Sequence, residues 1–153
     1  MTKTQTYALL LRQLEEILST ETNPIAKKAN MAAVLYNGLD NLNWAGFYVR
    51  HTDTLVLGPF QGKPACVRIA LGKGVCGTAA QTGQTQLVED IHRFAGHIAC
   101  DSASQCVIVI PIFKDNAVWG VLDIDAPILA RFDKEDQTYL EKAVQLFVQT
   151  SAL

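Results

Sequence analysis

Helical periodicity occurs only at the two ends of this chain, and that distribution limits the folds it can adopt. Residues 5–20 and 24–40 carry apolar side chains at helical spacing, as does the stretch 133–147. Asn23 and Asp133 are suited to cap the second and the last helix. Because the residues between these helices are typical of strands and turns, we expect an α+β fold with a central antiparallel β-sheet and helices packed on one side.

The middle of the chain is predicted to form the sheet. Its clearest part is a hairpin, in which the β-branched run 107–113 and the turn 114–116 lead into a returning run, 118–125. No linker or repeat interrupts the 153 residues, a length that suits one hydrophobic core, so we predict a single domain over 1–153. Further strands are expected at 44–50, 54–60, 65–69 and 86–89, and a short helix at 74–81.

Cys100 lies in a segment of unusual composition. Residues 90–104 show no strong period and contain many small and polar side chains, and a loop of this length in a compact domain is usually functional. A thiol becomes a thiolate more readily near positive charge or hydrogen-bond donors, and His92, Arg93 and His97 are candidates. The surroundings of Cys100 therefore favour thiol chemistry over packing.

Two other cysteines could take part in that chemistry. A sulfenic acid at Cys100 would condense with a nearby thiol, and folding could bring either Cys66 or Cys76 close to it. The sequence contains four cysteines but no Cys-x-x-Cys pair, which argues against a zinc knuckle and against a thioredoxin-type motif. From the residues alone, each cysteine is also compatible with a buried, inert thiol.

Charge and hydropathy exclude several other classes of protein. A formal net charge of −2 gives no electrostatic footprint for nucleic acid or for an anionic membrane. From the hydropathy pattern we expect neither a transmembrane stretch nor a secretory signal. We therefore expect a cytoplasmic protein, in which cysteines are more often catalytic, redox-active or metal-binding than joined in structural disulfides.

Asp123 and Asp125 lie two residues apart on a predicted strand, so both carboxylates should face the same way. Trp119 and Val121 are expected on that face as well. An apolar wall that ends in two carboxylates predicts a pocket for an ammonium group, because a desolvated cation needs opposite charge and acceptors. The same pattern also fits a solvated strand end.

Two further features are compatible with a small ligand. Trp44 and Tyr48 share one face of an earlier predicted strand and could form an aromatic wall, with the tyrosine hydroxyl as a polar contact. Two core aromatics would show the same spacing. The glycine-rich turn 72–77 could hold an anion at a helix N-terminus, although a tight strand-to-helix turn is the simpler explanation.

These residues fall in segments that resemble a known family, the free methionine-R-sulfoxide reductases built on a GAF domain. The resemblance covers nearly the whole chain, and it includes three cysteine positions that most GAF domains lack. The segments that carry it are NWAGFY (43–48), LGPFQGKPAC (57–66), GKGVCGTAA (72–80), GHIACDSAS (96–104) and GVLDID (120–125).

The resemblance implies the reduction of free L-methionine (R)-S-oxide to methionine in a small closed pocket. Cys100 matches the nucleophile, which would attack the sulfoxide sulfur, release methionine and become a sulfenic acid. Cys66 matches the cysteine that resolves this acid as an intramolecular disulfide, and Cys76 matches a secondary or alternative resolving cysteine. Thioredoxin would be the reductant, with no bound cofactor, and relatives suggest a homodimer.

The resemblance also implies how the pocket binds its substrate. Asp123 and Asp125 match carboxylates that hold the substrate ammonium. Trp44 matches an aromatic residue that packs on the methyl–sulfur end, and Tyr48 matches another pocket residue. These roles agree with the ammonium end and the aromatic wall that the residues themselves suggest.

One position departs from the family. Where the family has a glutamate that contacts the substrate and helps to protonate the sulfoxide oxygen, this chain has Val107, preceded by Cys106 as an extra thiol. Loss of a general acid costs about 10²–10⁴-fold in rate. We therefore expect an impaired reductase, unless Asp101, Asp123 or Asp125 supplies the proton. The alternative is a GAF module that binds or senses a small ligand with little or no turnover.

Overall fold

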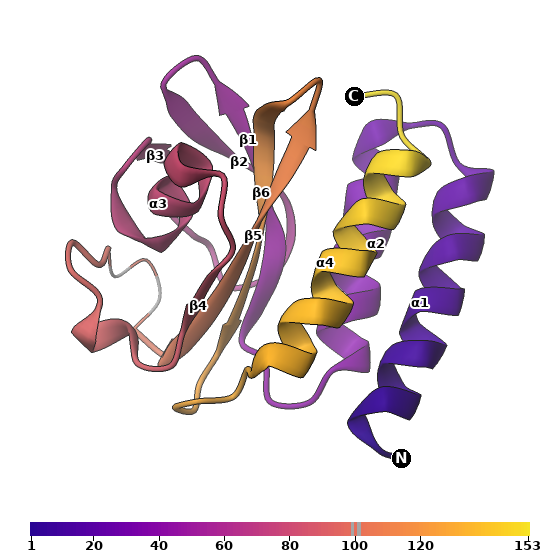
Figure 1. Cartoon of the computed structure of the whole chain (residues 1–153), viewed down its shortest axis with the longest axis horizontal. Helices are drawn as coiled ribbons and strands as arrows, with labels where there is room; N and C mark the ends of the chain where they lie inside the picture. The colour runs from indigo at the N-terminus through magenta and orange to yellow at the C-terminus, as the bar shows by residue number, and fades with distance from the viewer. Residues whose placement is uncertain (99, 101) are drawn as a thin grey trace.

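The computed structural model of the protein describes residues 1–98, 100 and 102–153. A six-stranded sheet runs through the molecule in the order β3-β2-β1-β6-β5-β4, and every neighbouring pair is antiparallel (Figure 1). The α+β class with an antiparallel sheet is confirmed. The strands are β1 (Trp44–His51), β2 (Thr54–Gly62), β3 (Arg68–Ala70), β4 (Gln86–Val88), β5 (Cys106–Lys114) and β6 (Ala117–Ala126).

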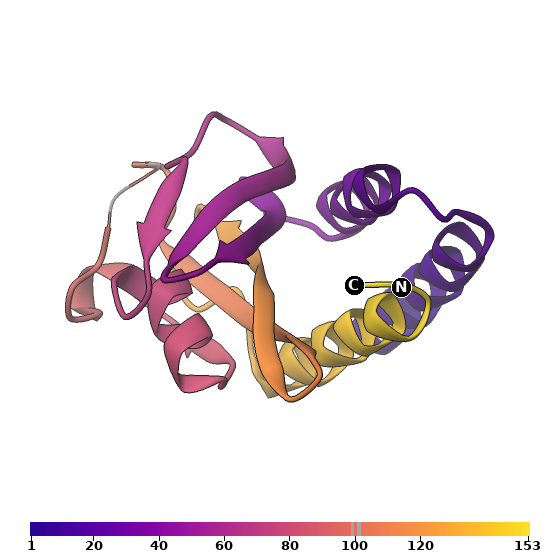
Figure 2. The ribbon, with the colours of Figure 1, turned by 90° about the horizontal axis from the view of Figure 1, so that it is seen from above.

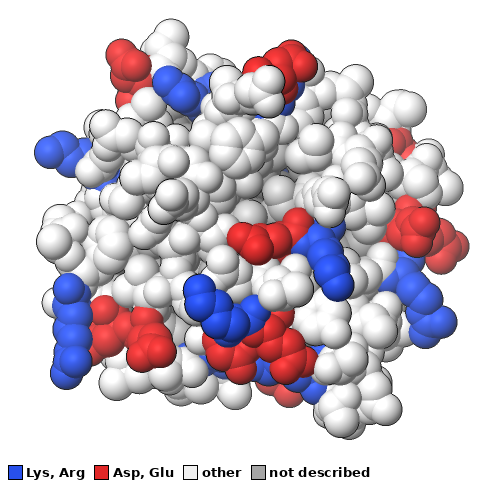
Figure 3. Space-filling model, viewed as in Figure 1, with Lys and Arg blue, Asp and Glu red and all other residues white. Residues whose placement is uncertain are grey.

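Three long helices lie on one side of the sheet, where two of them pack on the strands and the first packs on those two, and a short helix lies on the other side (Figures 1 and 2). In the space-filling view, charged side chains of both signs are interspersed on the visible face (Figure 3). Within the part of the chain that the structure describes, no helix is both long and apolar enough to cross a membrane. The long helices are α1 (Lys3–Thr20), α2 (Pro24–Gly38) and α4 (Lys134–Gln149), and the short one is α3 (Gly74–Thr82).

Both predicted helix caps are confirmed. The Asn23 side chain accepts hydrogen bonds from the first-turn amides of α2, and Asp133 does the same for α4. At the start of α4 the Asp136 side chain also accepts a bond from the Asp133 amide, which completes a capping box. These bonds satisfy amides that a helix leaves without partners, which is why both helices begin where the sequence indicates.

Side-chain alternation on the strands divides the interior into two apolar clusters. On β1, Ala45 and Phe47 belong to the helix-side core, whereas Trp44 and Tyr48 face α3, as their spacing predicted. The helix-side core is filled by aromatic and aliphatic contacts, such as the rings of Phe47 and Phe147 with centroids 5.2 Å apart. The opposite side packs α3 and the segment after β4 against the sheet, and it contains the candidate site.

The prediction that Trp119 shares a face with the two aspartates of β6 is wrong. Trp119 packs on the helix side, with its ring centroid 6.1 Å from that of Phe147 and 5.1 Å from the Lys28 ammonium. The cause is a β-bulge: the register of β5 against β6 shifts between Ile112 and Phe113 and leaves Trp119 as the extra residue. An extra residue reverses the alternation of side chains, and two-residue spacing in the sequence cannot detect it.

Candidate active site

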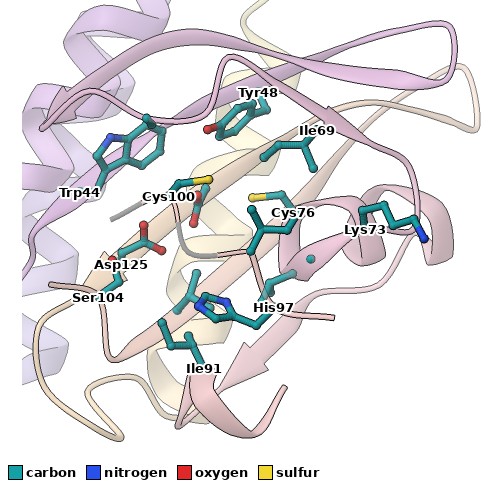
Figure 4. Close-up of a pocket in the computed structure, with 16 residues that line it drawn as sticks. Trp44, Tyr48, Ile69, Lys73, Cys76, Ile91, His97, Cys100, Ser104 and Asp125 are labelled. Atoms are coloured by element: carbon teal, nitrogen blue, oxygen red, sulfur yellow. The ribbon is translucent and has the colours of Figure 1, made fainter. Parts of the chain in front are cut away.

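A cavity of about 70 Å³ lies between the sheet and α3 (Figure 4). One water molecule needs roughly 10–15 Å³ of such space, so the cavity suits a small molecule. Six of the seven residues predicted for the site line it, and the seventh, Cys66, is bonded to one of them. The six are Trp44 and Tyr48 from β1, Cys76 from α3, Cys100, and Asp123 and Asp125 from β6.

Cys66 and Cys100 form a disulfide. Their Cα atoms are 5.5 Å apart, which is within the usual range for such a bond. Cys66 lies on the connection between β2 and β3, and Cys100 lies 34 residues further along the chain, between β4 and β5. Cys76 is a free, buried thiol. The sequence left Cys66 and Cys76 as alternative partners, and the structure pairs Cys66.

The two aspartates of β6 face the cavity, opposite Gly46 and Trp44 in the register of β1. Asp123 is only 8% exposed, and its Oδ1 atom has no hydrogen-bond partner among the described residues. Burial raises the pKa of Asp123 to about 6, although hydrogen bonds with the Asp125 and Cys76 side chains favour its ionised form. A buried carboxylate with an open acceptor position would stabilise a cationic group in the cavity.

Cys76 supports this carboxylate. Burial raises the pKa of the Cys76 thiol well above its ordinary value, and the neighbouring Asp123 and Asp125 raise it further. The thiol therefore stays protonated at neutral pH and acts as a hydrogen-bond partner of Asp123. In this position a protonated Cys76 is a poor nucleophile.

The polar atoms of the aromatic wall, which consists of Trp44 and Tyr48, form hydrogen bonds with the backbone of the protein. Trp44 and Tyr48 are each 2% exposed, and their ring centroids are 5.9 Å apart. The Tyr48 hydroxyl donates a hydrogen bond to the Cys66 carbonyl oxygen at 2.8 Å, and Trp44 Nε1 donates to the Lys63 carbonyl oxygen at 3.1 Å. The hydroxyl proton expected to contact a ligand is therefore already bonded to the backbone at Cys66.

Of the three cations considered near Cys100, His97 lines the cavity. Burial lowers the pKa of His97, and the nearby His92 lowers it further, which leaves the imidazole neutral at pH 7. His92 and Arg93 instead contact the Asp90 carboxylate, at 3.0 and 3.6 Å, and both side chains are largely exposed. Sequence proximity thus identified one relevant side chain and two surface residues.

Val107 lines the cavity at the position where the family resemblance predicts a glutamate. It is 5% exposed and pairs with Asp125 in the register of β5 and β6. The preceding residue, Cys106, lies in the helix-side core, where burial raises the pKa of its thiol. Its side chain therefore points away from the cavity. Asp101, another suggested proton source, lies outside the described residues.

The start of α3 also faces the cavity. Its first residues, Gly74 and Val75, line the space, and the cap residue Lys73 makes no side-chain hydrogen bond to the first turn. The Lys73 ammonium points away from the other labelled residues (Figure 4). Free amides at a helix N-terminus favour an anion, so this end of the cavity complements the two carboxylates of β6.

Several lining residues had no role assigned from the sequence. Ser104, which is 7% exposed, accepts a hydrogen bond from the Asn43 side chain at 2.9 Å, and Ile69 and Ile91 add apolar surface. They come from separate segments, and no spacing in the sequence links them. Across the described ranges, no group of three or more His, Cys, Asp or Glu side chains is arranged to hold a metal ion.

Comparisons with known proteins agree with this geometry. A family model described as GAF domain matches residues 13–150. A curated Escherichia coli (strain K12) protein named free methionine-R-sulfoxide reductase is 52% identical over 144 residues, covering 94% of this chain and 87% of that protein. A structure described as a putative GAF sensor protein from Burkholderia vietnamiensis is 53% identical, with a TM-score of 0.96 and coverage of 99% and 96%. The free methionine-R-sulfoxide reductase from Neisseria meningitidis, solved in complex with its substrate, is 42% identical, with a TM-score of 0.95 and coverage of 98% and 90%.

Proposed function

The chain belongs to the GAF-domain family of free methionine-R-sulfoxide reductases, and we propose that it reduces free L-methionine (R)-S-oxide to methionine with thioredoxin as the reductant. The observation that carries the proposal is the Cys66–Cys100 disulfide, with Cys100 in the wall of a small cavity that also contains two carboxylates. This bond is the oxidised product that a thiol-dependent reduction would leave in the protein.

In the proposed reaction, the Cys100 thiolate attacks the sulfoxide sulfur. The oxygen takes up a proton and is transferred to Cys100 as a sulfenic acid, and methionine leaves with its sulfur reduced by two electrons. The Cys66 thiolate then attacks the sulfenic sulfur, which forms the S–S bond and expels hydroxide. The hydroxide leaves as water with the proton that the Cys66 thiol lost. A thioredoxin dithiol reduces the disulfide and restores both cysteines.

The two ends of the cavity suit the two charges of a free amino acid. We assign the substrate ammonium to Asp123 and Asp125, because the open acceptor position of Asp123 needs a donor. The substrate carboxylate would lie at the first-turn amides of α3, which the Lys73 side chain does not cap. The methyl–sulfur end would pack on Trp44, whose buried ring forms part of the wall.

A second candidate function rests on Val107. Because its apolar side chain replaces a proton donor in the cavity wall, the protein could bind methionine sulfoxide or a related amino acid and turn it over slowly or not at all. That would make the chain a GAF binding or sensor module. The carboxylates, the α3 amides and the aromatic wall serve binding in either case, so turnover separates the two functions.

The test is turnover of free methionine-R-sulfoxide with thioredoxin, thioredoxin reductase and NADPH. We expect slow turnover by the natural protein, none by Cys100→Ser, and a rate about 10²–10⁴-fold higher for Val107→Glu. Val107→Leu is the matched control and should stay slow. An inactive natural protein whose Val107→Glu variant is active would favour the binding module. Inactivity of both, in protein that binds no methionine, would reject both functions.

A further inference from the structure

The connection that carries Cys66 is tied to the sheet by the aromatic side chains of β1. The Tyr48 hydroxyl donates to the Cys66 carbonyl oxygen at 2.8 Å, and three residues earlier the Lys63 carbonyl accepts a bond from Trp44 Nε1. On the other side, the Leu57 amide of β2 donates to the Val67 carbonyl oxygen at 2.9 Å. The backbone at Cys66 is thus held from two strands.

The Cys100 backbone has a different kind of support. Its amide donates to the Ile98 carbonyl oxygen only two residues earlier, at 3.1 Å, which is a local turn contact. Among the described residues, hydrogen bonds from the strands of the sheet therefore hold the backbone at Cys66, whereas the bond at Cys100 is local. A disulfide requires Cα atoms about 4.4–6.8 Å apart, and the observed distance is 5.5 Å, so a shift of about an ångström at Cys66 would take the pair toward the limit.

The Tyr48 hydroxyl is suited to a permanent structural bond. The side chain is 2% exposed, and burial raises the pKa of its phenol well above the ordinary value, with Asp123 adding to the effect. The hydroxyl thus remains protonated at physiological pH. It has one proton to donate, and that proton is used by the Cys66 carbonyl.

We propose that Tyr48 is a positioning residue for disulfide formation, in which its hydroxyl holds the Cys66 backbone so that the thiolate can reach the Cys100 sulfenic acid. This role rests on the proposed function but concerns the step after methionine leaves. In that step Cys66 Sγ attacks Cys100 Sγ, the S–O bond breaks as the S–S bond forms, and the oxygen leaves as water. The phenol takes no part in the bond changes.

The test bypasses the substrate. Reduced protein is treated with one equivalent of hydrogen peroxide, which converts the Cys100 thiolate directly into a sulfenic acid, and disulfide formation is followed by loss of free thiols and by dimedone trapping. In Tyr48→Phe the ring stays and the carbonyl loses its donor. A buried acceptor without its partner is destabilised, so the Cys66 backbone is no longer held in place. We therefore expect disulfide formation to slow about tenfold and dimedone-labelled Cys100 to accumulate.

The matched control is Tyr7→Phe, which removes a buried hydroxyl on the helix side of the sheet. It should leave the rate of disulfide formation unchanged while lowering the melting temperature. A wild-type rate in Tyr48→Phe would overturn the proposal, since a residue that served only as a pocket wall for methionine sulfoxide would give that result. The peroxide reaction needs no turnover of the sulfoxide, so a failure of the proposed function would be seen separately in the thioredoxin assay.

Discussion

Two buried aspartates on opposite sides of the sheet have very different surroundings. Asp136, on the helix side, is fully buried; it accepts bonds from the Tyr7 hydroxyl at 2.6 Å, from the Lys3 ammonium at 2.8 Å and from the Asp133 amide at 2.9 Å. Asp123, on the cavity side, has an Oδ1 atom with no hydrogen-bond partner in the part of the chain that the structure describes. A satisfied buried carboxylate stabilises the fold, whereas an unsatisfied one beside a cavity costs stability and favours a ligand.

The cysteines repeat this contrast. Cys106 fills a position in the helix-side core, and Cys100 lies in the cavity wall with its sulfur bonded to Cys66. Burial alone therefore does not distinguish a packing thiol from a reactive one, and the groups around the sulfur must also be known. The helix side of the molecule maintains the fold, and the α3 side provides the polar groups that chemistry requires.

The largest expected effect separates the two thiols. Cys100→Ser should abolish turnover of free methionine-R-sulfoxide, because serine is not a comparable nucleophile toward sulfur. Cys106→Ala should retain the turnover number and lose about 1–2 kcal/mol in the free energy of unfolding, since it leaves a small void in the core. The measurements are the thioredoxin-coupled assay and urea unfolding. Loss of turnover in a folded Cys106→Ala protein would contradict the assignment of Cys106 to the fold and of Cys100 to the chemistry.

The next effect concerns the satisfied aspartate. Asp136→Asn removes the negative charge between Lys3 and Arg131, so we expect the free energy of unfolding at pH 7 to fall by about 3 kcal/mol. The matched change, Asp123→Asn, should cost less than about 1 kcal/mol, because it removes an under-satisfied buried charge. Urea denaturation measures both. Equal losses in the two variants would contradict the contrast between the aspartates.

The smallest effect is a pH dependence. Folding raises the pKa of Asp123 from 3.8 to about 6, so the folded protein binds this proton more tightly than the unfolded chain. The contribution of this bound proton to the free energy of unfolding is fully present below about pH 4, and it is lost as the pH rises through 6. Relative to Asp123→Asn, the natural protein should therefore lose about 1–3 kcal/mol between pH 4 and pH 7.

Parallel urea titrations at several pH values measure that difference. Asp115→Asn, in the exposed turn between β5 and β6, is the control and should show no such change relative to the natural protein. If the difference in free energy of unfolding between the natural protein and Asp123→Asn does not change with pH, the prediction is wrong. Polar groups of the free protein would then already stabilise the ionised Asp123 carboxylate.

The same carboxyl should also affect activity. The kcat/KM of the natural protein should fall as the pH drops below 6, because binding of the substrate ammonium needs ionised Asp123.

Much of the fold was predictable because its signals are local. Helical periodicity, the caps Asn23 and Asp133 and the strand runs depend on neighbouring residues, and the structure confirms them to within a few residues at the ends. Spacing of two placed Asp123 and Asp125 on one face correctly. The same rule failed at Trp119, because a bulge depends on how β5 and β6 align and leaves no signal in spacing.

By itself, the sequence determined the order of the elements, the residue types of the site and the family to which the chain belongs. Tertiary structure decided which of Cys66 and Cys76 joins Cys100 and where the Tyr48 hydroxyl donates its proton. It also decided which carboxylate oxygen has no hydrogen-bond partner among the described residues. The physical reason is distance along the chain. Local periodicity is fixed by adjacent residues, whereas the approach of segments 34 residues apart depends on the packing of α3 and the strands between them.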